Sequence, residues 1–465
     1  MTDNVIALKS GIWYTVSSFL FKSITFISTP LFTRIISLDE YGMYSNYQSW
    51  FMILTIIISL NLEATFISAK YDYSNSINDY IDSIISLSVC SGIIWIMGYT
   101  ISYSYLDAYL NIPTLLMYLM IIQIIGNSII NIFQTKCLYE FNYKKNIMIS
   151  GFNTISTASI SVILVVLMND KVLGRVLGSL IPALLIVIYF FFLKKEFNLS
   201  FNIHHWQYAL PISIPYIPHL LSLLILNCID RIMIHDIYGP SDTALYSLAY
   251  NCACILIVFM TAVNSAFCPW LSNKMHRKEY KDICKITTYY IIAFSYIVFG
   301  FLLIAPEILL LFGGEKYGQS LNVIPIVSVG CFFQFLYTFY VNVEQFLKKT
   351  TFMAVATITA AVLNIVLNLY FIPLYGYIAA AYTTLICYFW LLLVHYFLIR
   401  IIVHNHLFNQ KIFFLLAVSF ASFAALFCKI YIFDTIRYIL ISVYFLIGLG
   451  LALKYNKVIK DIFKN

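Results

Sequence analysis

A single lysine inside an apolar run is the residue of this chain best placed to bind a charged ligand. Lys22 precedes Arg34 by about three helical turns, which puts it ~18 Å deeper along a predicted helix, near the middle of a bilayer. A cation at that depth is costly, so it indicates a site for an anion. The alternative is that Lys22 snorkels to the inner headgroups or pairs with a carboxylate. The acidic residues that could be its partners all lie near predicted helix ends: Glu63, Asp230, Glu307 and Glu344.

Four further ionisable residues are candidates for a substrate path. Arg34 and Arg231 end two apolar helices at equivalent positions of a repeated pattern, and we expect both near the outer surface. His219 and Asp230 lie about three turns apart on one predicted helix, within ~20° of each other around its axis. Asp230 can instead pair with its neighbour Arg231 at the outer boundary. Both interpretations of Asp230 remain open.

Two predicted helices carry matching stripes of polar side chains. At a constant offset the first stripe is repeated in the second: Gln123, Asn127, Asn131 and Gln134, then Gln334, Thr338, Asn342 and Gln345. Asn153 and Asn364 keep the same offset. The spacing places each stripe along one face of its helix, and such a face does not point to lipid. The stripes are either interhelical hydrogen-bond contacts or a polar wall that meets the hydroxyls of a sugar.

The composition defines the elements that must position these residues. With 61% hydrophobic and 11% charged residues and a mean hydropathy of +0.86, the chain is predicted to be an all-α polytopic membrane protein. The ten cysteines lie in apolar segments without the spacing of a metal site, so we expect no metal and no cofactor. Hydropathy predicts fourteen transmembrane spans, at 10–32, 42–66, 81–103, 113–133, 148–168, 172–193, 209–233, 243–270, 286–311, 322–346, 352–372, 375–399, 412–432 and 436–454.

The distribution of charge predicts the orientation of these spans. With an even number of spans both termini lie on one side, and most of the 28 basic residues then fall in segments on that side. This bias predicts that both termini are cytoplasmic. The net charge of +7 therefore reflects topology and contact with anionic lipids, and the basic segment from Lys274 to Lys285 requires no nucleic-acid partner.

A repeated pattern predicts two similar halves. The segments from Thr29 to Gln48 and from Pro211 to Tyr250 each contain an apolar helix ending in arginine, a turn with Tyr-Gly, and a helix that opens with Tyr-Ser. We therefore expect a six-helix bundle over residues 1–200, a second over 201–405, and two additional spans with a cytoplasmic tail over 406–465. Because each bundle has an even number of helices, the two repeats are expected to be parallel.

The second copy of the pattern also carries three prolines inside one predicted span, Pro211, Pro215 and Pro218. Each proline removes a backbone hydrogen bond, so this helix should be bent or broken. A span interrupted by proline at the junction of two repeats is typical of a transporter's substrate path. A kink that only improves packing is the alternative.

Four segments of the chain resemble the polysaccharide-export branch of the multidrug/oligosaccharidyl-lipid/polysaccharide exporter superfamily. They are TPLFTRIISLDEYGMYS (29–45), DRIMIHDIYGPSDTALYSLAY (230–250), PEILLLFGGEKYG (306–318) and LNIVLNLYFIPLYGYIAAAYTT (363–384). The order and spacing of these segments across twelve helices carry the resemblance. In two places the chain departs from the family pattern. Residues 37–40 replace a glycine-rich turn and Ala379-Ala380 replaces Gly-Ala, and we interpret both as drift.

The resemblance implies a fold and a function. It implies two six-helix bundles around a central V-shaped cavity and a flippase in the bacterial inner membrane. The cargo would be an undecaprenyl-diphosphate-linked oligosaccharide, a repeat unit of O-antigen or capsular polysaccharide, and a polymerase and glycosyltransferases would be partners. The cations and polar stripes described above would then contact that cargo.

Two rival functions predict different residues. A drug/cation antiporter of the same fold is expected to hold mid-membrane carboxylates, whereas this chain offers lysine and arginine, which favour an anionic cargo. A membrane enzyme such as a repeat-unit polymerase or an acyltransferase is expected to carry a sizeable outer loop with catalytic residues. The predicted outer segments are short, and no GxxxxGK[ST] phosphate loop occurs. We therefore expect a transporter and not an enzyme.

Overall fold

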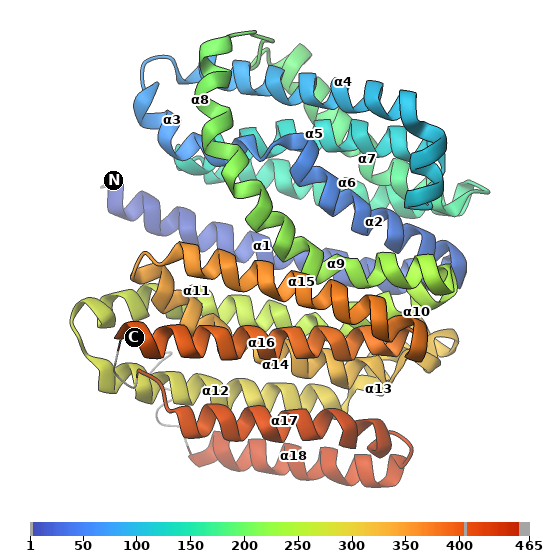
Figure 1. The fold of residues 1–465 in the computed structure, drawn as a ribbon, viewed down its shortest axis with the longest axis vertical. Helices are drawn as coiled ribbons and strands as arrows, with labels where there is room; N and C mark the ends of the chain where they lie inside the picture. Colours follow the sequence, from blue (N-terminus) through green and yellow to red (C-terminus); the bar gives the residue numbers. More distant parts are fainter. Residues whose placement is uncertain (1–2, 404–406, 455–465) are drawn as a thin grey trace. The chain divides into compact units, whose positions relative to one another are not determined.

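The protein is built from helices. Its structure, a computed structural model, describes residues 3–403 and 407–454, and all regular elements within those ranges are helical (Figure 1). Within these described ranges, eleven helical segments are long and apolar enough to cross a membrane, and one bent pair of helices makes a twelfth. The chain is therefore an all-α polytopic membrane protein, as its composition predicts. The first and last of the fourteen predicted spans fall within α1 (Asp3–Ile35) and α18 (Asp434–Lys454).

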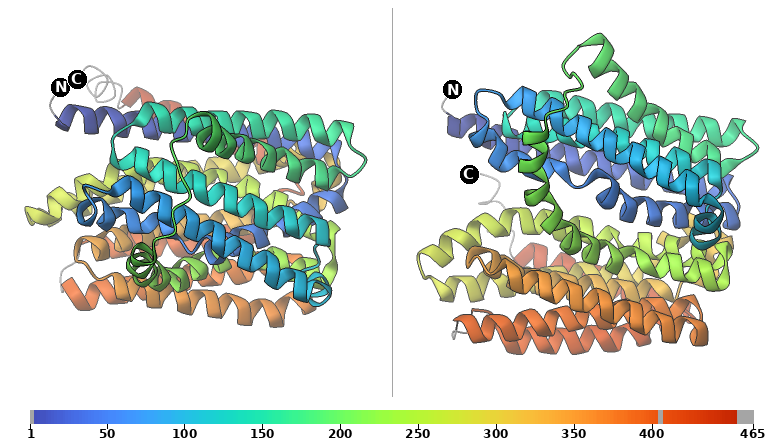
Figure 2. Two further views of the ribbon diagram at one scale, coloured as in Figure 1. Left: turned by 90° about the horizontal axis from the view of Figure 1, so that it is seen from above. Right: turned by 45° about the horizontal axis from the view of Figure 1, so that its top comes forward.

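The chain divides into two compact units, unit 1 (Met1–Ala244) and unit 2 (Leu245–Asn465). In unit 1, α6 packs along α1 and α7, and α5 packs along α4 and α7. Figures 1 and 2 show α4 and α5 side by side in each view. The α-helices of unit 1 are α1, α2 (Leu38–Ser59), α3 (Phe66–Asp72), α4 (Ile77–Leu110), α5 (Thr114–Tyr139), α6 (Tyr143–Leu167), α7 (Lys171–Ile188), α8 (Ile203–Ser213), α9 (Ile217–Tyr238) and the start of α10 (Pro240–Ala253).

Unit 2 is organised around α14, which is the most buried of the candidate spans. The helix α14 packs against α11 and α12, which precede it in the chain, and against α16 and α17, which follow it. The polar side chains on this helix, Gln334, Thr338 and Asn342 among them, are poorly suited to lipid contact and favour its burial among other helices. The α-helices of unit 2 are the end of α10, α11 (Ile255–His276), α12 (Tyr280–Leu303), α13 (Ala305–Gly313), α14 (Val323–Phe346), α15 (Thr350–Tyr375), α16 (Tyr377–Val403), α17 (Gln410–Ile430) and α18.

The packing units and the repeated pattern divide the chain at different places. The pattern predicts bundles over 1–200 and 201–405, whereas the packing division falls at Ala244. The difference arises because α8 packs against α4 and α9 packs against α2, so both helices belong to unit 1 by contact. The helices α17 and α18 pack onto α14 and α12 within unit 2. The repeat boundaries stay a prediction about sequence symmetry.

The proline-rich span is interrupted, as its sequence predicts. The helix α8 ends at Ser213, a 3-10 turn follows at Ile214–Tyr216, and α9 begins at Ile217. Pro215 lies in that turn, where a missing N–H removes no α-helical hydrogen bond. A second interruption lies after α2, where Leu60 and Asn61 both adopt left-handed backbone conformations, with φ of 56° and 50°. The two helical segments flanking it are bent by 46°.

The residues interpreted as drift have a structural role at the start of α2. The Ser37 hydroxyl accepts a hydrogen bond from the Glu40 backbone N–H at 3.2 Å, and the Glu40 carboxylate accepts one from the Ser37 N–H at 2.7 Å. This reciprocal arrangement is a capping box, which satisfies backbone groups that a helix start leaves open. The acidic side chains of Asp39 and Glu40 also complement the positive end of the helix dipole. In place of a glycine-rich turn, residues 37–40 form a capping box that stabilises the start of α2.

Candidate functional site

One arginine of unit 1 is held between aromatic rings. The guanidinium carbon of Arg175, on α7, lies 4.2 Å from the centre of the Phe32 ring on α1 and 3.9 Å from that of Tyr44 on α2. The Tyr41 ring is 5.6 Å away. Such contacts contribute roughly 0.5–2 kcal/mol each and orient the planar cation by its faces. The edges of the guanidinium, which carry its hydrogen-bond donors, remain available.

The Nη1 atom of Arg175 is buried and has no hydrogen-bond partner within residues 3–403 and 407–454. A buried donor without a partner costs about 1–3 kcal/mol, and more when it is charged. Such a group calls for an explanation, such as a bound ion, an ordered water or a catalytic role. We therefore interpret Arg175 as a candidate anion-binding residue.

Sequence reasoning counted Arg175 only as a topological charge, although α7 contains a signal for its position. Gly174 and Gly178 form a small-x-x-x-small pattern, which is typical of helices that approach a neighbour closely. A Cβ on Gly178 would lie 2.2 Å from the Ser161 hydroxyl oxygen on α6, so α7 needs glycine there. Close packing of that glycine face on α6 determines which face of α7 carries Arg175 toward α1 and α2.

Of the two predicted cations on α1, the structure describes the side chain of Arg34 but not that of Lys22. Arg34 lies in the last turn of α1 and is exposed. Lys22 belongs to the same helix, but its side chain lies outside the described residues. The backbone between them is helical, and the depth of Lys22 in the membrane stays a prediction.

The two copies of the repeated pattern differ in helix register. Arg34 ends α1, whereas Arg231 is buried within α9, about two turns before that helix ends at Tyr238. Gly239, with φ of +87°, terminates α9, because a left-handed residue stops a helix and glycine adopts that conformation without strain. Gly42, its counterpart in the pattern, lies inside the first turns of α2.

Gly42 has a separate reason to be glycine. A Cβ at this position would lie 1.8 Å from the carbonyl oxygen of Pro240, so no side chain fits there. Beside this contact the Ser241 hydroxyl donates to the Asp39 carboxylate at 2.5 Å. The Asn111 side chain donates to the Asp236 carboxylate at 2.9 Å. The turn after α9 therefore packs closely against the start of α2 within unit 1 and is hydrogen-bonded to it.

His219 and Asp230 share α9, as predicted, but their environments differ. Asp230 is buried, with 1% of its surface exposed, whereas His219 is half-buried. The backbone carbonyl of His219 accepts a hydrogen bond from the Ser222 hydroxyl at 2.8 Å. Burial of a carboxyl group within a span makes Asp230 the stronger candidate of the two.

The first polar stripe lies on α5 and contacts neighbouring helices. The Gln123 side chain accepts a hydrogen bond from the Tyr47 hydroxyl at 3.2 Å and donates one to the Ser179 hydroxyl at 3.0 Å. It therefore connects α5 with α2 and α7. Asn127, one turn further on, is half-buried, and Gln134 donates to Ser150 on α6 at 2.8 Å.

The second stripe lies on α14. The Thr338 hydroxyl donates to the Gln334 backbone carbonyl at 2.7 Å, a local bond within the helix. The Gln334 side-chain oxygen is buried without a hydrogen-bond partner among the described residues. Asn342 donates to Asn264 on α11 at 2.7 Å. Asn342 thus connects this stripe to α11, while the side-chain oxygen of Gln334 has no partner among the described residues.

Asn364 is fully buried on α15 and belongs to a hydrogen-bonded group with α16. Its side chain donates to the Thr384 hydroxyl at 3.4 Å and accepts from Asn368 at 3.2 Å. The Thr383 hydroxyl in turn donates to Asn368. These bonds join α15 and α16 through amides and hydroxyls in an otherwise apolar interface.

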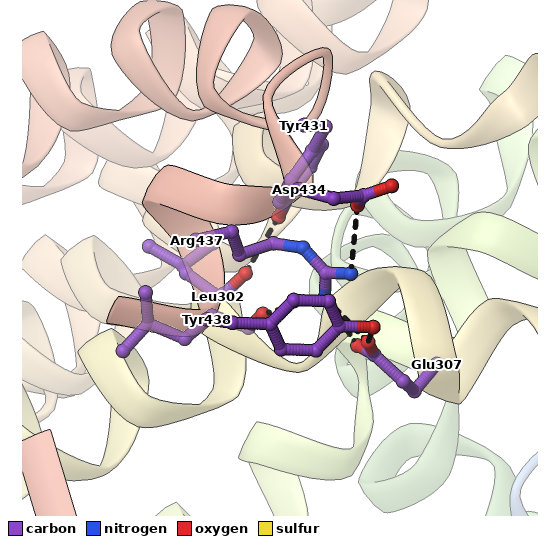
Figure 3. Close-up of polar contacts among 7 residues, drawn as sticks. Leu302, Glu307, Tyr431, Asp434, Arg437 and Tyr438 are labelled. Carbon is purple, nitrogen blue, oxygen red and sulfur yellow. Dashed lines mark hydrogen bonds and ion pairs between the residues drawn. The ribbon is translucent and has the colours of Figure 1, made fainter. Parts of the chain in front are cut away.

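A second arginine, in unit 2, is bonded at both terminal nitrogens. The Nη1 atom of Arg437 contacts both carboxylate oxygens of Glu307 at 2.6 Å, and Nη2 donates to Asp434 at 3.1 Å (Figure 3). The Tyr431 hydroxyl donates to the Leu302 carbonyl at 2.8 Å. The contacts of Arg437 attach α18 to the end of α12 and to α13 and occupy both of its terminal nitrogens, while its Nε atom is buried without a partner among the described residues.

The comparisons with solved structures concern the fold. An inward closed form of the lipid II flippase MurJ matches 96% of this chain and 100% of that chain, with a TM-score of 0.72 and 16% sequence identity. An inward-facing multidrug resistance transporter of the MATE family matches 85% of this chain and 97% of that chain, with a TM-score of 0.65 and 14% identity. The TM-scores show a shared fold, and at identities this low they show the fold alone.

The comparisons of sequence point to polysaccharide biosynthesis. The "Lsg locus putative protein 1" of Haemophilus influenzae is 24% identical over 279 residues, which span 58% of this chain and 67% of that protein. An uncharacterised membrane protein of the same organism is 22% identical over 282 residues.

The MatE family model matches residues 215–370. The family model described as "Polysaccharide biosynthesis protein" matches residues 7–275, more than half of the chain. The chain belongs to this polysaccharide biosynthesis protein family, within the exporter superfamily that its motifs resemble.

Proposed function

We propose that this protein flips an undecaprenyl-diphosphate-linked oligosaccharide from the inner to the outer leaflet of a bacterial inner membrane. The observation that carries the proposal is Arg175, a cation held by aromatic faces whose buried Nη1 has no hydrogen-bond partner in the described part of the chain. This site lies in a fold similar to that of a lipid II flippase. Membership of the polysaccharide biosynthesis protein family supports an oligosaccharide as the transported group.

The chemistry of the cargo explains why a flippase needs cations. A diphosphate headgroup carries roughly two negative charges, and an unpaired charge cannot leave water without a penalty of several kcal/mol. Lys22, Arg175 and Arg34 lie in one unit, on α1 and on the helix that packs with α1 through Phe32. We infer that the diphosphate passes along these cations, with Arg231 as a further cation on α9.

The membrane potential favours the outward direction. Moving one elementary charge across 100 mV changes the free energy by ~2.3 kcal/mol, so outward passage of two negative charges gains roughly 5 kcal/mol in an inside-negative cell. The half-buried amides of the stripes, Asn127 and Gln334 among them, supply hydrogen bonds that sugar hydroxyls require. Binding of the oligosaccharide and movement of the diphosphate therefore use different residues.

The pathway assignment follows from the cargo. The repeat unit would belong to O-antigen or capsular polysaccharide, glycosyltransferases would assemble it on the cytoplasmic leaflet, and a polymerase would join the units outside. Both termini would be cytoplasmic, as the distribution of basic residues predicts. The protein itself would act as a transporter and not as an enzyme.

A drug/cation antiporter is the second candidate function. Its support is the MatE family match over residues 215–370 and the fold shared with a multidrug resistance transporter. An antiporter for cationic drugs needs a carboxylate in its substrate path. Asp230 on α9 and Glu344 on α14 are buried carboxyl groups that such an antiporter would use. The Nη1 atom of Arg175, which has no hydrogen-bond partner among the described residues, favours an anionic cargo instead.

Reconstitution separates these two functions. Purified full-length protein is placed in liposomes with a fluorescent undecaprenyl-diphosphate N-acetylglucosamine, and the probe that reaches the opposite leaflet is followed by chemical quenching. We expect faster exchange than in protein-free liposomes and no movement of the cationic dye ethidium. Movement of ethidium without movement of the lipid probe would overturn the proposal in favour of the antiporter.

Deletion of the gene provides the matching experiment in cells. We expect a lipid-linked oligosaccharide to accumulate on the cytoplasmic leaflet, and its sugar composition would identify the cargo. The control is the deletion strain carrying the intact gene. A strain without the gene that exports its polysaccharide normally and accumulates no lipid intermediate would contradict the proposal.

A further inference from the structure

Unit 2 has a narrow pocket at the end of α16 that the distribution of basic residues predicts to be cytoplasmic. Its walls include Tyr340 on α14, Tyr396 and Arg400 on α16, Phe408 just before α17, and Gln410 at the start of α17, and we call it the α16 pocket. The rings of Tyr340 and Phe408 meet edge to face, with centroids 5.1 Å apart and an interplanar angle of 89°. Three segments of the chain therefore meet around one arginine.

Arg400 is oriented by a hydrogen bond and has no carboxylate partner. Its Nη1 atom donates to the Tyr396 hydroxyl at 3.2 Å, and that hydroxyl donates to the Gln410 side-chain oxygen at 3.4 Å. Within residues 3–403 and 407–454, no ion pair joins Arg400 to an acidic residue. A guanidinium carries five N–H donors, and the bond to Tyr396 uses one of them. The others can bind an anion, because the Arg400 side chain is exposed.

Three lysines add positive charge at the same end of unit 2. Lys348 and Lys349 lie in the turn between α14 and α15, Lys411 lies in the first turn of α17, and all three are exposed. The acidic residue nearest to this turn in the sequence is Glu344, which is buried against His395 on α16 at 2.8 Å. This contact also places the end of α14 beside the end of α16. Between residues 396 and 411 the sequence contains no acidic residue, so this end of unit 2 carries an excess of positive charge.

Two lysines elsewhere on the predicted cytoplasmic side show the contrast. Lys145 on α6 lies 2.5 Å from the Glu196 carboxylate, and Lys274 on α11 contacts the carboxylates of both Glu279 and Asp282. These lysines have their counter-charges within the protein. The cations around the α16 pocket have none among the described residues, and a group of cations without an internal counter-charge attracts an anion from its surroundings.

The surface of α16 beside Arg400 is apolar. Phe397 and Ile401 lie within ~100° of Arg400 around the helix axis, and 53% and 68% of their surfaces are exposed. Exposed apolar side chains near the end of a membrane span are suited to contact acyl chains. A cation that can bind a phosphate therefore stands directly beside a surface for hydrocarbon. This combination fits a phospholipid better than free phosphate, which would leave the apolar surface unused.

We propose that the α16 pocket binds the phosphate of an anionic phospholipid from the cytoplasmic leaflet, with Arg400 as its main ligand. Basic pockets between spans on the cytoplasmic side of membrane proteins bind acidic headgroups in this way. The bound phosphate would join the ends of α14, α16 and α17. The inference goes beyond the proposed flippase function and does not depend on it, because the pocket lies in unit 2 and shares no residue with the cations assigned to the cargo.

Native mass spectrometry of the full-length protein tests the site. Protein purified in detergent is titrated with dioleoyl phosphatidylglycerol, and the bound lipid is counted per chain. For Arg400→Gln we expect about tenfold weaker binding of the first lipid, because a charge-assisted contact to phosphate is lost. Tyr396→Phe should weaken binding less, because it removes the hydroxyl that orients the guanidinium but keeps the charge. The control Arg277→Gln removes another exposed arginine, just after α11, and should bind like the wild type.

Further ligands identify what is bound. Dioleoyl phosphatidylcholine, whose headgroup has no net charge, should bind the wild type more weakly, and millimolar inorganic phosphate should not displace phosphatidylglycerol. Equal binding of phosphatidylglycerol by the wild type and all folded variants would reduce the interaction to diffuse attraction and overturn the site. Complete displacement by an equimolar amount of the undecaprenyl-diphosphate probe would assign the pocket to the cargo and likewise overturn the proposal. If Arg400→Gln does not fold, Tyr396→Phe decides. No arm of the experiment requires flipping, so failure of the proposed function leaves its outcome readable.

Discussion

Two arginines illustrate how the two units use charge differently. In unit 2, Arg437 has both terminal nitrogens bonded to the carboxylates of Glu307 and Asp434, and it joins α18 to its neighbours. In unit 1, Arg175 is held by the faces of Phe32 and Tyr44, and its buried Nη1 has no partner among the described residues. The Nε atom of Arg437 is also buried without a partner among the described residues, but its two terminal nitrogens, which would bind an anion side by side, are occupied by carboxylates. An arginine positioned by its faces keeps donors for an anion.

Buried acidic groups extend the comparison. Unit 2 buries Glu344 against His395 and fills the α15–α16 interface with amides and hydroxyls. Unit 1 supplies the cations of α1 and α7. We infer that the cations of unit 1 contact the anionic cargo. The predictions below test the contrast between the two units.

The largest effect is expected at Lys22. Lys22→Ala should abolish flipping of the lipid probe, because the diphosphate would cross the middle of the membrane without a cation. Lys22→Arg should retain part of the activity, because charge matters more than shape. Flipping is measured in liposomes at matched protein content. A normal rate for Lys22→Ala would mean that the lysine only snorkels to the headgroups, and the cation path would have to be redrawn.

A smaller loss is expected at Arg175. Arg175→Gln should lower the flipping rate about tenfold, which corresponds to ~1.4 kcal/mol of lost stabilisation of the passing anion. Arg175→Lys should be intermediate, because it keeps the charge but not the planar group that the rings hold. The control is Arg437→Gln, which should lower the thermal unfolding temperature while each folded molecule keeps its flipping rate. If Arg437→Gln slows flipping as much as Arg175→Gln, the two arginines do not differ as proposed.

Two variants on α5 should distinguish the two interpretations of the first polar stripe, hydrogen-bond contact between helices and a polar wall for the cargo. Gln123→Leu should reduce the amount of folded protein, because it breaks hydrogen bonds to Tyr47 and Ser179 that contribute about 1 kcal/mol each. Asn127→Leu, one turn away, should slow flipping without loss of protein. Both are measured by fluorescence size-exclusion chromatography and by flipping per folded molecule. Should Asn127→Leu lose protein and keep activity, the stripe is packing contact throughout.

The smallest effect is expected at the start of α2. Ser37→Ala should destabilise the protein by about 1 kcal/mol through loss of the capping box, with unchanged flipping per folded molecule. Ser37→Asp should recover most of the stability, because aspartate also accepts hydrogen bonds at an N-cap. Thermal unfolding in detergent measures both variants. Wild-type stability of Ser37→Ala would restore the interpretation of residues 37–40 as drift.

How much of the site follows from sequence depends on the distance over which its parts interact. The spacing of the stripes on α5 and α14 can be seen in the sequence because it is local to one helix, but their contacts cannot, and the structure leaves Asn131 and Gln345 exposed. The role of Arg175 could not be predicted, because it requires the rings of Phe32 and Tyr44 from two other helices. Likewise nothing local in the sequence pairs Glu344 with His395.

The sequence by itself determined the class of protein, the positions of the predicted spans and the interruption at Pro215, because hydropathy and the missing proline N–H act within a single segment. The tertiary structure decided the rest. It assigned α9 to unit 1 through its packing on α2, and it required glycine at position 42 because the Pro240 carbonyl lies where a side chain would be. Such contacts join residues far apart in the chain, and their geometry exists only once the helices have packed.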